Sequence, residues 1–445
     1  MERLERVIFY SLILLLPTQL GKHFWPDFTI VSGIRIDYLS PTLYITDILL
    51  ILLFAFTFLH WMKTVEISKF TFHISKQQFK NKIFIGSFIL LFLLSNTVFA
   101  LRPLLSFYGL AKLGEFVFFG WYIVKTVRYH FQLQDSALLF AISSLFESLL
   151  AIAQYIHQGS LNGIFYYFGE RAFTGTTPGI ANADIGGILV LRPYGTFSHP
   201  NVLAGFLLIS LVIAWSLLLT AKKRWMRVIG IVSLLIGSIA LLLTFSRVVI
   251  LLWGILLVGT GGRLVFRSLK TLPGKVLFIT VVIIGLIAIS FIPVVHDILL
   301  RFSQTSLSDE SVTEREELLS TAFTMIRQHP LFGVGLYNFI PAMAPLQKPM
   351  PLGLYLQPVH NIFVLVFAET GIVGEILFLW LLITIAFRIK HHILRIKGTL
   401  VVLLLIILVT GMFDHYWLTL QQGQLLFAYV IGLCFALMHD RKKVS

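Results

Sequence analysis

Polar and charged side chains interrupt apolar stretches at four places in the chain. They are Arg192, His199 and Asn201 in "LRPYGTFSHPNVLAGFLL", Arg247 in "LLLTFSRVVILL", Arg315, and His360, Asn361 and Glu369 in "HNIFVLVFAETGIVGEI". An ionisable group at membrane depth costs a few kcal/mol, so it usually has a partner or a function. Arginine makes forked hydrogen bonds to phosphate oxygens, and a neutral histidine accepts protons near neutral pH. Three arginines at one depth therefore predict a polyanion site with a histidine base beside it.

Several of these residues also have a purely structural interpretation. Arg247 taken alone is equally consistent with an arginine whose charged end reaches the lipid headgroups. His360 stands at an expected helix start, where an interfacial cap is the more common role on position alone. Glu369 lies inside the same apolar segment, and we expect it to cap or pair between helices.

Two other polar pairs are assigned to structure. Asp414 and His415 in "GMFDHYW" have aromatic neighbours, which indicates an interfacial belt. Lys112 and Glu115 are three residues apart in one apolar segment, so we expect them to pair with each other.

Composition identifies the elements that must position these residues. Hydrophobic residues make up 57% of the 445 and charged residues 13%, about half of what is usual in soluble domains. A spanning helix needs roughly 20 mostly apolar residues, and such segments recur along the whole chain. We predict an all-α polytopic membrane protein of a single domain, 1–445. Its twelve predicted spans are 6–21, 42–60, 83–100, 104–124, 136–157, 200–220, 228–244, 248–261, 276–294, 359–387, 398–416 and 418–438. The first apolar run has no A-x-A-like cleavage site after it, so we expect it to be a retained helix.

Charge sets the expected orientation. One family of loops, together with both termini, carries 24 of the 35 Lys and Arg, so the positive-inside rule places both termini in the cytoplasm. Two long segments, 158–199 and 295–358, then lie on the outer face. The spans fall into groups around these loops, at 1–157, 200–294 and 359–438. The net charge of +14 is explained by this distribution, and we expect no nucleic-acid partner.

Local signals place two helix starts near the predicted site. Pro200 suits a first helical turn, with Ser198 or His199 as the N-cap. In the second outer loop, Ser311 and Glu314 have the spacing of a capping box. The expected inward face of that helix consists of Arg315, Leu319, Ala322 and Ile326.

Metal and nucleotide chemistry are not indicated. The chain has no H-E-x-x-H motif, and its single cysteine, Cys434, excludes an intramolecular disulfide. Its acidic cluster of Glu314, Glu316 and Glu317 follows a solvated helix start. No glycine-rich phosphate loop follows a strand, so we expect no cofactor.

Four stretches in order, "RPYGTFSHPNVLAGFL", "LLTFSRVVIL", "EREELLSTAFTMIRQHPLFGVGLYNF" and "HNIFVLVFAETGIVGEILF", resemble the O-antigen ligase and O-antigen polymerase superfamily of bacterial membrane glycosyltransferases. The resemblance covers about residues 180–385. It implies a GT-C-type fold with catalysis on the periplasmic face and a helical periplasmic loop between spans nine and ten. It also implies metal-independent inverting transfer from an undecaprenyl-diphosphate-linked glycan.

The resemblance assigns roles residue by residue. Arg192 and Arg247 match the positions expected to hold the diphosphate, Arg315 matches the loop arginine, and His360 matches the base proposed for the acceptor hydroxyl. We assign these four residues to catalysis, and the three arginines also to substrate binding. His199, Asn201 and Asn361 are further predicted substrate-binding residues, although the first two are also explained by shaping the helix start.

The preferred function is therefore a ligase in the inner membrane that transfers a glycan to lipid A–core or a similar surface molecule. Its expected partners are the lipid-linked donor, a glycolipid or glycan acceptor and membrane lipids. The alternatives are an O-antigen or exopolysaccharide polymerase, an O-linked protein oligosaccharyltransferase and, from a different class, a membrane transporter. A transporter would carry polar residues through the bilayer midplane, whereas this sequence concentrates them at the outer ends of spans.

Overall fold

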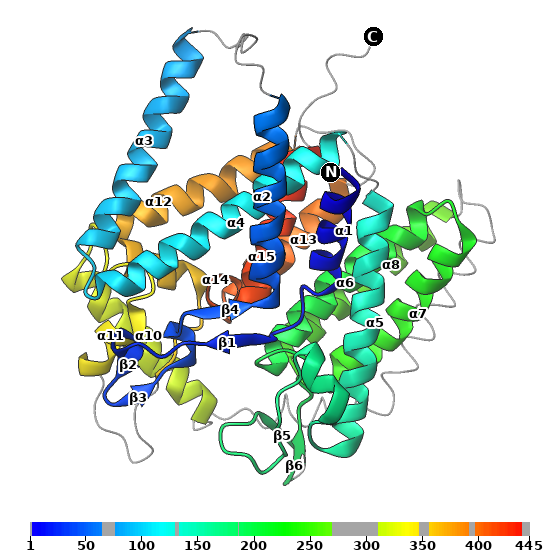
Figure 1. Ribbon diagram of the computed structural model, residues 1–445. Helices are drawn as coiled ribbons and strands as arrows, with labels where there is room; N and C mark the ends of the chain where they lie inside the picture. The colour runs from blue at the N-terminus through cyan, green and yellow to red at the C-terminus, as the bar shows by residue number, and fades with distance from the viewer. Residues whose placement is uncertain are drawn as a thin grey trace.

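The chain is mostly helical in the computed structural model, which describes residues 2–64, 76–129, 133–185, 187–268, 310–346, 356–390 and 397–437 (Figure 1). Its α-helices are α1 (Glu2–Leu14), α2 (Ile45–Thr64), α3 (Lys76–Val98), α4 (Pro103–Tyr129), α5 (Leu133–His157), α6 (Pro200–Thr220), α7 (Arg224–Leu243), α8 (Arg247–Ser268), α10 (Glu310–Gln328), α11 (Phe339–Met343), α12 (Ile362–Lys390), α13 (Lys397–Gly411), α14 (Tyr416–Thr419) and α15 (Gln421–Leu437). The short 3₁₀ helices are η1 (Asp27–Thr29), η2 (Asp37–Leu39), η3 (Gly163–Phe168) and η4 (Ala344–Leu346).

Several helices are suited to cross a membrane, which makes this a multi-pass membrane protein. Among the described residues, five are long and apolar enough: 45–62, 133–157, 200–220, 224–243 and 362–389. Shorter apolar helices cover 86–98, 247–259, 398–411 and 421–436. The predicted span 276–294 lies outside the described residues, so the count of twelve stays a prediction. The predicted span 6–21 is too long, because α1 ends at Leu14 and a turn leads into Pro17.

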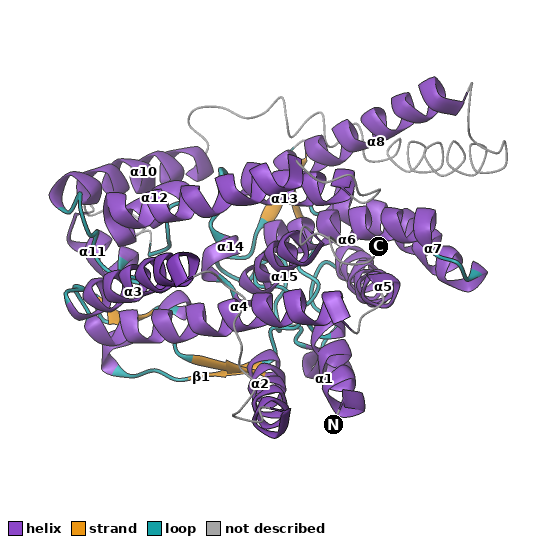
Figure 2. Cartoon of the chain, turned by 90° about the horizontal axis from the view of Figure 1, so that it is seen from above, coloured by secondary structure: helices purple, strands orange, loops and turns teal. Residues whose placement is uncertain are grey.

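Helix α6 lies at the centre of the main hydrophobic core. It contacts α5, α7, α8, α13 and α15, and Leu203, Leu207 and Leu211 are fully buried. Such burial on all sides explains why its sequence is apolar all round and not amphipathic. Helix α15 packs between α4 and α13 in the view from above (Figure 2). The first residues of α6 are thereby held in the middle of the bundle.

Helices α1 and α15 both contact the first turn of α5. Tyr10 in α1 donates to Asp135, and Tyr429 in α15 donates to Ser136. The short strands gather at the opposite end of the bundle, shown at the bottom of Figure 1 and called here the strand end. The described residues of the two predicted outer loops therefore share one end of the bundle, opposite the start of α5.

Three two-stranded antiparallel sheets correct the expectation of an all-α fold. They pair β1 (Gly21–His23) with β4 (Thr42–Tyr44), β2 (Ile30–Val31) with β3 (Ile34–Arg35), and β5 (Asn182–Ile185) with β6 (Ile188–Leu191). The β2–β3 hairpin turns through Ser32 and Gly33, which both have positive φ, as a tight two-residue hairpin loop requires. Strands this short carry too little alternation to stand out in an apolar sequence.

Helices α10 and α11 form a second small core with α12 at the strand end. Ala322 on α10 is buried as predicted, but its buried neighbours on that face are Leu318 and Met325, each one residue before the predicted Leu319 and Ile326. Arg315 therefore falls at the edge of that face and its side chain is exposed, not turned into the protein. The predicted capping box is also wrong, because α10 already begins at Glu310 and includes Ser311.

Candidate functional site

Four segments that are far apart in the chain meet at the strand end. They are the loop that leads into α6, the turn between α7 and α8, the residues before α12, and the connection between α13 and α14. Each contributes side chains or carbonyls to one connected set of hydrogen bonds and ring contacts. Within this set, the three residues His360, Asp414 and His415 are called the His–Asp cluster.

The start of α6 is capped as predicted. His199 is the N-cap residue, and its Nδ1 accepts a hydrogen bond from the Asn201 backbone N–H at 3.1 Å. Pro200 follows at the first helical position, where its missing N–H leaves no helical bond unmade. The His199 ring is thus used in part by the helix, and the neighbouring Asn201 side chain points toward other groups of the site.

Arg192 joins the α6 start to the α7–α8 turn. Its side chain is buried, with Nε donating to the Thr244 carbonyl at 2.7 Å and Nη2 donating to Asn201 Oδ1 at 2.6 Å. Thr244 closes α7, and Arg247 begins α8 three residues later. The turn between them is tight, because Phe245 adopts a positive φ of 51°. The structure therefore places Arg192 against the turn from which Arg247 begins α8.

Asn201 links the arginine to a buried acid. Its Nδ2 donates to Asp414 Oδ2 at 3.0 Å, and the His415 backbone N–H donates to Asp414 Oδ1 at 2.8 Å. The Asp414 and His415 side chains are only 9% and 3% exposed. The interfacial-belt interpretation of these two residues is wrong. The one feature of the sequence that could have assigned them to the site was their predicted depth in the membrane, which matches that of His360.

The two histidines of the cluster lie ring to ring. The His360 and His415 ring centroids are 5.2 Å apart in an edge-on arrangement, and Tyr38 approaches His415 on another side at 5.3 Å. His415 Nδ1 hydrogen-bonds with Thr419 Oγ1 at 2.6 Å. The Nδ1 atom of His360 is buried without a hydrogen-bond partner among the described residues. His360 thus keeps one buried ring nitrogen, Nδ1, that no described residue bonds.

Burial and charge set the protonation of the cluster. Burial lowers the pKa of His360 below 6.5, Asp414 acts to raise it, and Arg315 lowers it further. Burial likewise lowers the pKa of His199 and of His415. Burial alone would raise the pKa of Asp414, but the three histidines and the Asn201 hydrogen bond together lower it. At neutral pH the cluster therefore holds an ionised carboxylate among neutral imidazoles.

The remaining predicted residues have different surroundings. Asn361 caps α12, because its Oδ1 accepts from the N–H groups of Phe363 and Val364 at 3.0 and 3.1 Å. Arg315 is exposed but near enough to His360 to affect its pKa. Glu369 does bond between elements, as expected, since its Oε1 accepts from the Phe339 N–H at the start of α11.

The predicted Lys112–Glu115 pair is confirmed at 3.0 Å. Lys112 also lies 2.8 Å from Asp47 in α2, and it donates to Gln421 at the start of α15. This ionic network therefore ties α2, α4 and α15 together, with one lysine held between two carboxylates.

The three residues of the cluster could also act as ligands of a metal ion. His360, Asp414 and His415 each offer one ligand atom, and these atoms lie within 4.8 Å of one another. Two imidazoles and a carboxylate suit zinc or another transition metal. Motif reasoning misses this set because its members come from two segments that are distant in the chain.

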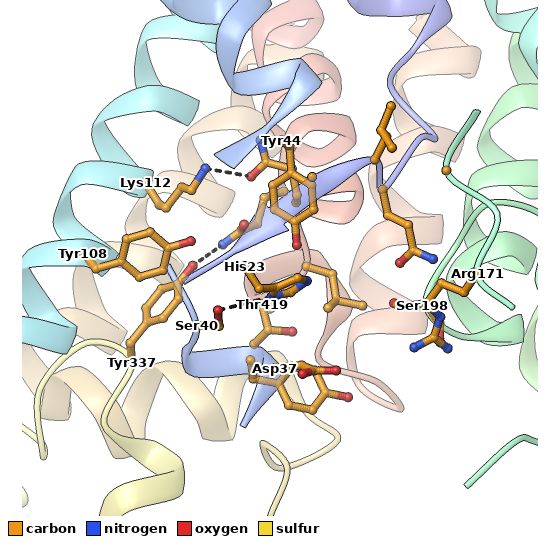
Figure 3. Close-up of a pocket in the computed structure, with 18 of the residues that line it drawn as sticks. His23, Asp37, Ser40, Tyr44, Tyr108, Lys112, Arg171, Ser198, Tyr337 and Thr419 are labelled. Carbon is orange, nitrogen blue, oxygen red and sulfur yellow. Dashed lines mark hydrogen bonds between the residues drawn. The ribbon is translucent and has the colours of Figure 1, made fainter. Parts of the chain in front are cut away.

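A cavity of about 330 Å³ adjoins the cluster (Figure 3). Its wall includes Tyr38 and Thr419, which both contact His415, and Ser198, which precedes the N-cap His199. The site thus combines a polar pocket, a histidine with a carboxylate neighbour, and two arginines at one turn.

Comparison with known proteins agrees with the sequence resemblance. The family model described as O-antigen ligase matches residues 232–379, a stretch that begins within α7 and ends within α12. It contains Arg247, Arg315 and His360, while Arg192 and Asp414 lie outside it. No curated protein matches the chain. Residues 232–379 of this membrane protein are therefore similar to the O-antigen ligase family.

Proposed function

We propose that this protein is a metal-independent, inverting glycosyltransferase that moves a glycan from an undecaprenyl-diphosphate-linked donor to an acceptor hydroxyl on the outer face of the inner membrane. A ligase that acts on lipid A–core or a similar surface glycolipid is the preferred form. The observation that carries the proposal is the His360–Asp414–His415 cluster, linked through Asn201 to Arg192 beside the α7–α8 turn.

The arginines supply the electrostatic part of the reaction. As the glycosidic bond breaks, negative charge develops on the diphosphate leaving group, and fixed cations aimed at it stabilise the transition state. Arg192 is held by two hydrogen bonds, so its guanidinium needs little reorganisation when charge develops. Arg247 at the first residue of α8 adds a second cation at the helix N-terminus, where the backbone also favours anions.

His360 supplies the base. The acceptor oxygen attacks the anomeric carbon while its proton moves to the neutral imidazole. The bond from that carbon to the diphosphate oxygen breaks, and the lipid diphosphate leaves with the electron pair. One displacement inverts the anomeric carbon, and His360 then releases its proton to water. The negative charge of Asp414 stabilises the protonated imidazole, as a carboxylate does in other histidine-based sites.

Substitution of the proposed residues tests this function. In purified protein given a lipid-linked donor and acceptor, His360→Ala, Arg192→Ala and Arg247→Ala should each lower release of the diphosphate lipid by about 10²–10³-fold or more. Exposed residues at the end of α10 provide matched controls, His329→Ala and Arg327→Ala, which should keep full activity. Full activity in all three site variants would refute the assignment.

The acceptor class is decided in cells. In a deletion strain, loss of a ligase leaves polymer that is not attached to its acceptor, whereas loss of a polymerase leaves single donor units. Loss of a protein glycosyltransferase instead removes a stained glycoprotein while surface glycolipid stays normal. The first outcome supports the ligase, and either of the others replaces it within the same chemistry.

A further inference from the structure

The cavity beside the His–Asp cluster has the lining of a carbohydrate site. Five tyrosines line it: Tyr38, Tyr44, Tyr108, Tyr166 and Tyr337. Figure 3 shows Tyr108 and Tyr337 on one side, and Arg171 and Ser198 on the other. Three glutamine side chains, Gln19, Gln421 and Gln424, complete the polar wall. Aromatic rings stack on the apolar faces of sugars, while amides and hydroxyls bond their hydroxyl groups.

Two polar atoms of cavity-lining residues lack a protein partner. Gln19 Nε2 and Ser198 Oγ are both buried and make no hydrogen bond with the residues that the structure describes. Buried polar groups are normally satisfied, so these two atoms of cavity-lining residues are available to hydrogen-bond a ligand in the cavity. A sugar hydroxyl accepts from the glutamine amide and both donates to and accepts from serine.

The charges around the cavity favour a neutral ligand. Lys112 is paired with Asp47 and Glu115, and so adds no free cation to the wall. The positive charge of Arg171 is opposed by the negative charges of Asp37 and Glu170, which also line the cavity. Arg192 and Arg247 lie at the α7–α8 turn, and neither arginine lines the cavity. The cavity is therefore suited to an uncharged sugar and not to the diphosphate.

The cavity adjoins the cluster that contains the proposed base. Tyr38 separates it from His415 by a single ring contact of 5.3 Å, and His415 lies against His360 at 5.2 Å. Its volume of about 330 Å³ is at the small end for a ligand site and is suited to a mono- or disaccharide. From these observations we infer that the cavity binds a neutral sugar of the acceptor glycan, next to the unit that carries the reacting hydroxyl. This inference rests on the proposed function.

Direct binding tests the cavity without any turnover. The probes are the methyl glycosides of glucose, galactose and N-acetylglucosamine, observed by saturation-transfer NMR with full-length protein in detergent. At least one glycoside should bind, and Gln19→Leu and Ser198→Ala should each weaken its binding about fivefold or more. Gln422→Leu is the matched control, because Gln422 also has a buried amide without a described partner but does not line the cavity. No binding of any glycoside, or equal binding in all variants, overturns the inference.

Kinetics separate this inference from the proposed function. Gln19→Leu should raise KM for the acceptor about fivefold or more, with kcat and the KM for the lipid-linked donor unchanged. A raised donor KM would instead make the cavity a donor site and overturn the inference. His360→Ala should bind the glycoside like the wild type while losing transfer. If His360→Ala retains transfer although the glycoside binds in the cavity, the proposed base fails and the sugar site stands.

Discussion

At the scale of single residues, His360 is under two opposing influences. Asp414 stabilises its protonated form and Arg315 destabilises it, while burial keeps the pKa of the imidazole below its usual value. A general base must be neutral before the reaction and must hold a proton in the transition state. The buried Asp414 carboxylate helps the imidazole to hold a proton in the transition state. The imidazole is still neutral before the reaction, because the pKa of His360 stays lowered overall.

The pH dependence of transfer should therefore have a single acidic limb. Activity should be constant above about pH 6.5 and fall below the lowered pKa of His360, where the imidazole becomes protonated. Asp414→Asn should move this limb to lower pH, and Arg315→Gln should move it to higher pH, each with reduced maximal rate. The measurement is kcat/KM against pH for the three proteins. Limbs that stay fixed, or that move in the same direction, would contradict the electrostatic roles given to both residues.

Metal removal distinguishes a base from a metal ligand at the same residues. If His360 acts as a base, dialysis against a chelator should leave transfer unchanged. Added Zn²⁺ should inhibit reversibly, because His360, Asp414 and His415 are close enough to share an ion that occupies the base. His415→Gln should reduce this sensitivity to zinc. Loss of activity on chelation with recovery on zinc addition would show that the reaction depends on the metal.

At the scale of elements, a break inside α12 is held by hydrogen bonds to the turn that follows α10. Gly371 has φ 67° and ψ −171°, so the helix is interrupted there and the carbonyls before it are released. Val334 and Gly335 donate their N–H groups to the carbonyls of Ala368 and Glu369, while Ile372 donates to the Pro330 carbonyl. The turn after α10 thus takes the place of the missing helical hydrogen bonds.

Gly371→Ala should therefore destabilise the fold. A side chain at this positive φ costs about 1–3 kcal/mol, and its Cβ would also collide with the Leu331 backbone. The expected result is a melting temperature in detergent that is several degrees lower. Gly254→Ala in α8 is the control, because open space surrounds that glycine and alanine favours a helix. Equal stability of the two variants would show that the break is not held by this packing.

The same comparison of elements shows what sequence reasoning recovers. The helices followed from hydropathy because a bilayer requires long apolar segments, and the His199 cap followed from a local pattern of Ser, His and Pro. Asp414 and His415 were missed because their function depends on contact with His360, which no local spacing encodes. The short strands and the rotation of α10 were missed for the same reason, since tertiary packing selects them.

At the scale of the whole molecule, polarity is divided between the two ends of the bundle. The His–Asp cluster, Arg192 and the cavity lie at the strand end, whereas Lys222 and Lys223 in the turn between α6 and α7, and Arg224 at the first residue of α7, lie at the opposite end. A lipid-linked donor presents its diphosphate at a membrane surface, so a site at one end of the helices is reached without crossing the bilayer. The orientation of the chain then decides in which compartment the reaction occurs.

Cysteine labelling tests this orientation. Cys434 is the only cysteine and is buried, so Cys434→Ala provides a clean background. Lys22→Cys and Asp184→Cys introduce exposed thiols at the strand end, and Lys223→Cys introduces one in the turn between α6 and α7 at the opposite end. Because the positive-inside rule places the basic loops in the cytoplasm, a membrane-impermeant maleimide should label positions 22 and 184 in intact spheroplasts, and position 223 only after lysis. The reverse pattern would place the site in the cytoplasm, where the acceptor of a surface glycan is absent, and would exclude the proposed ligase reaction.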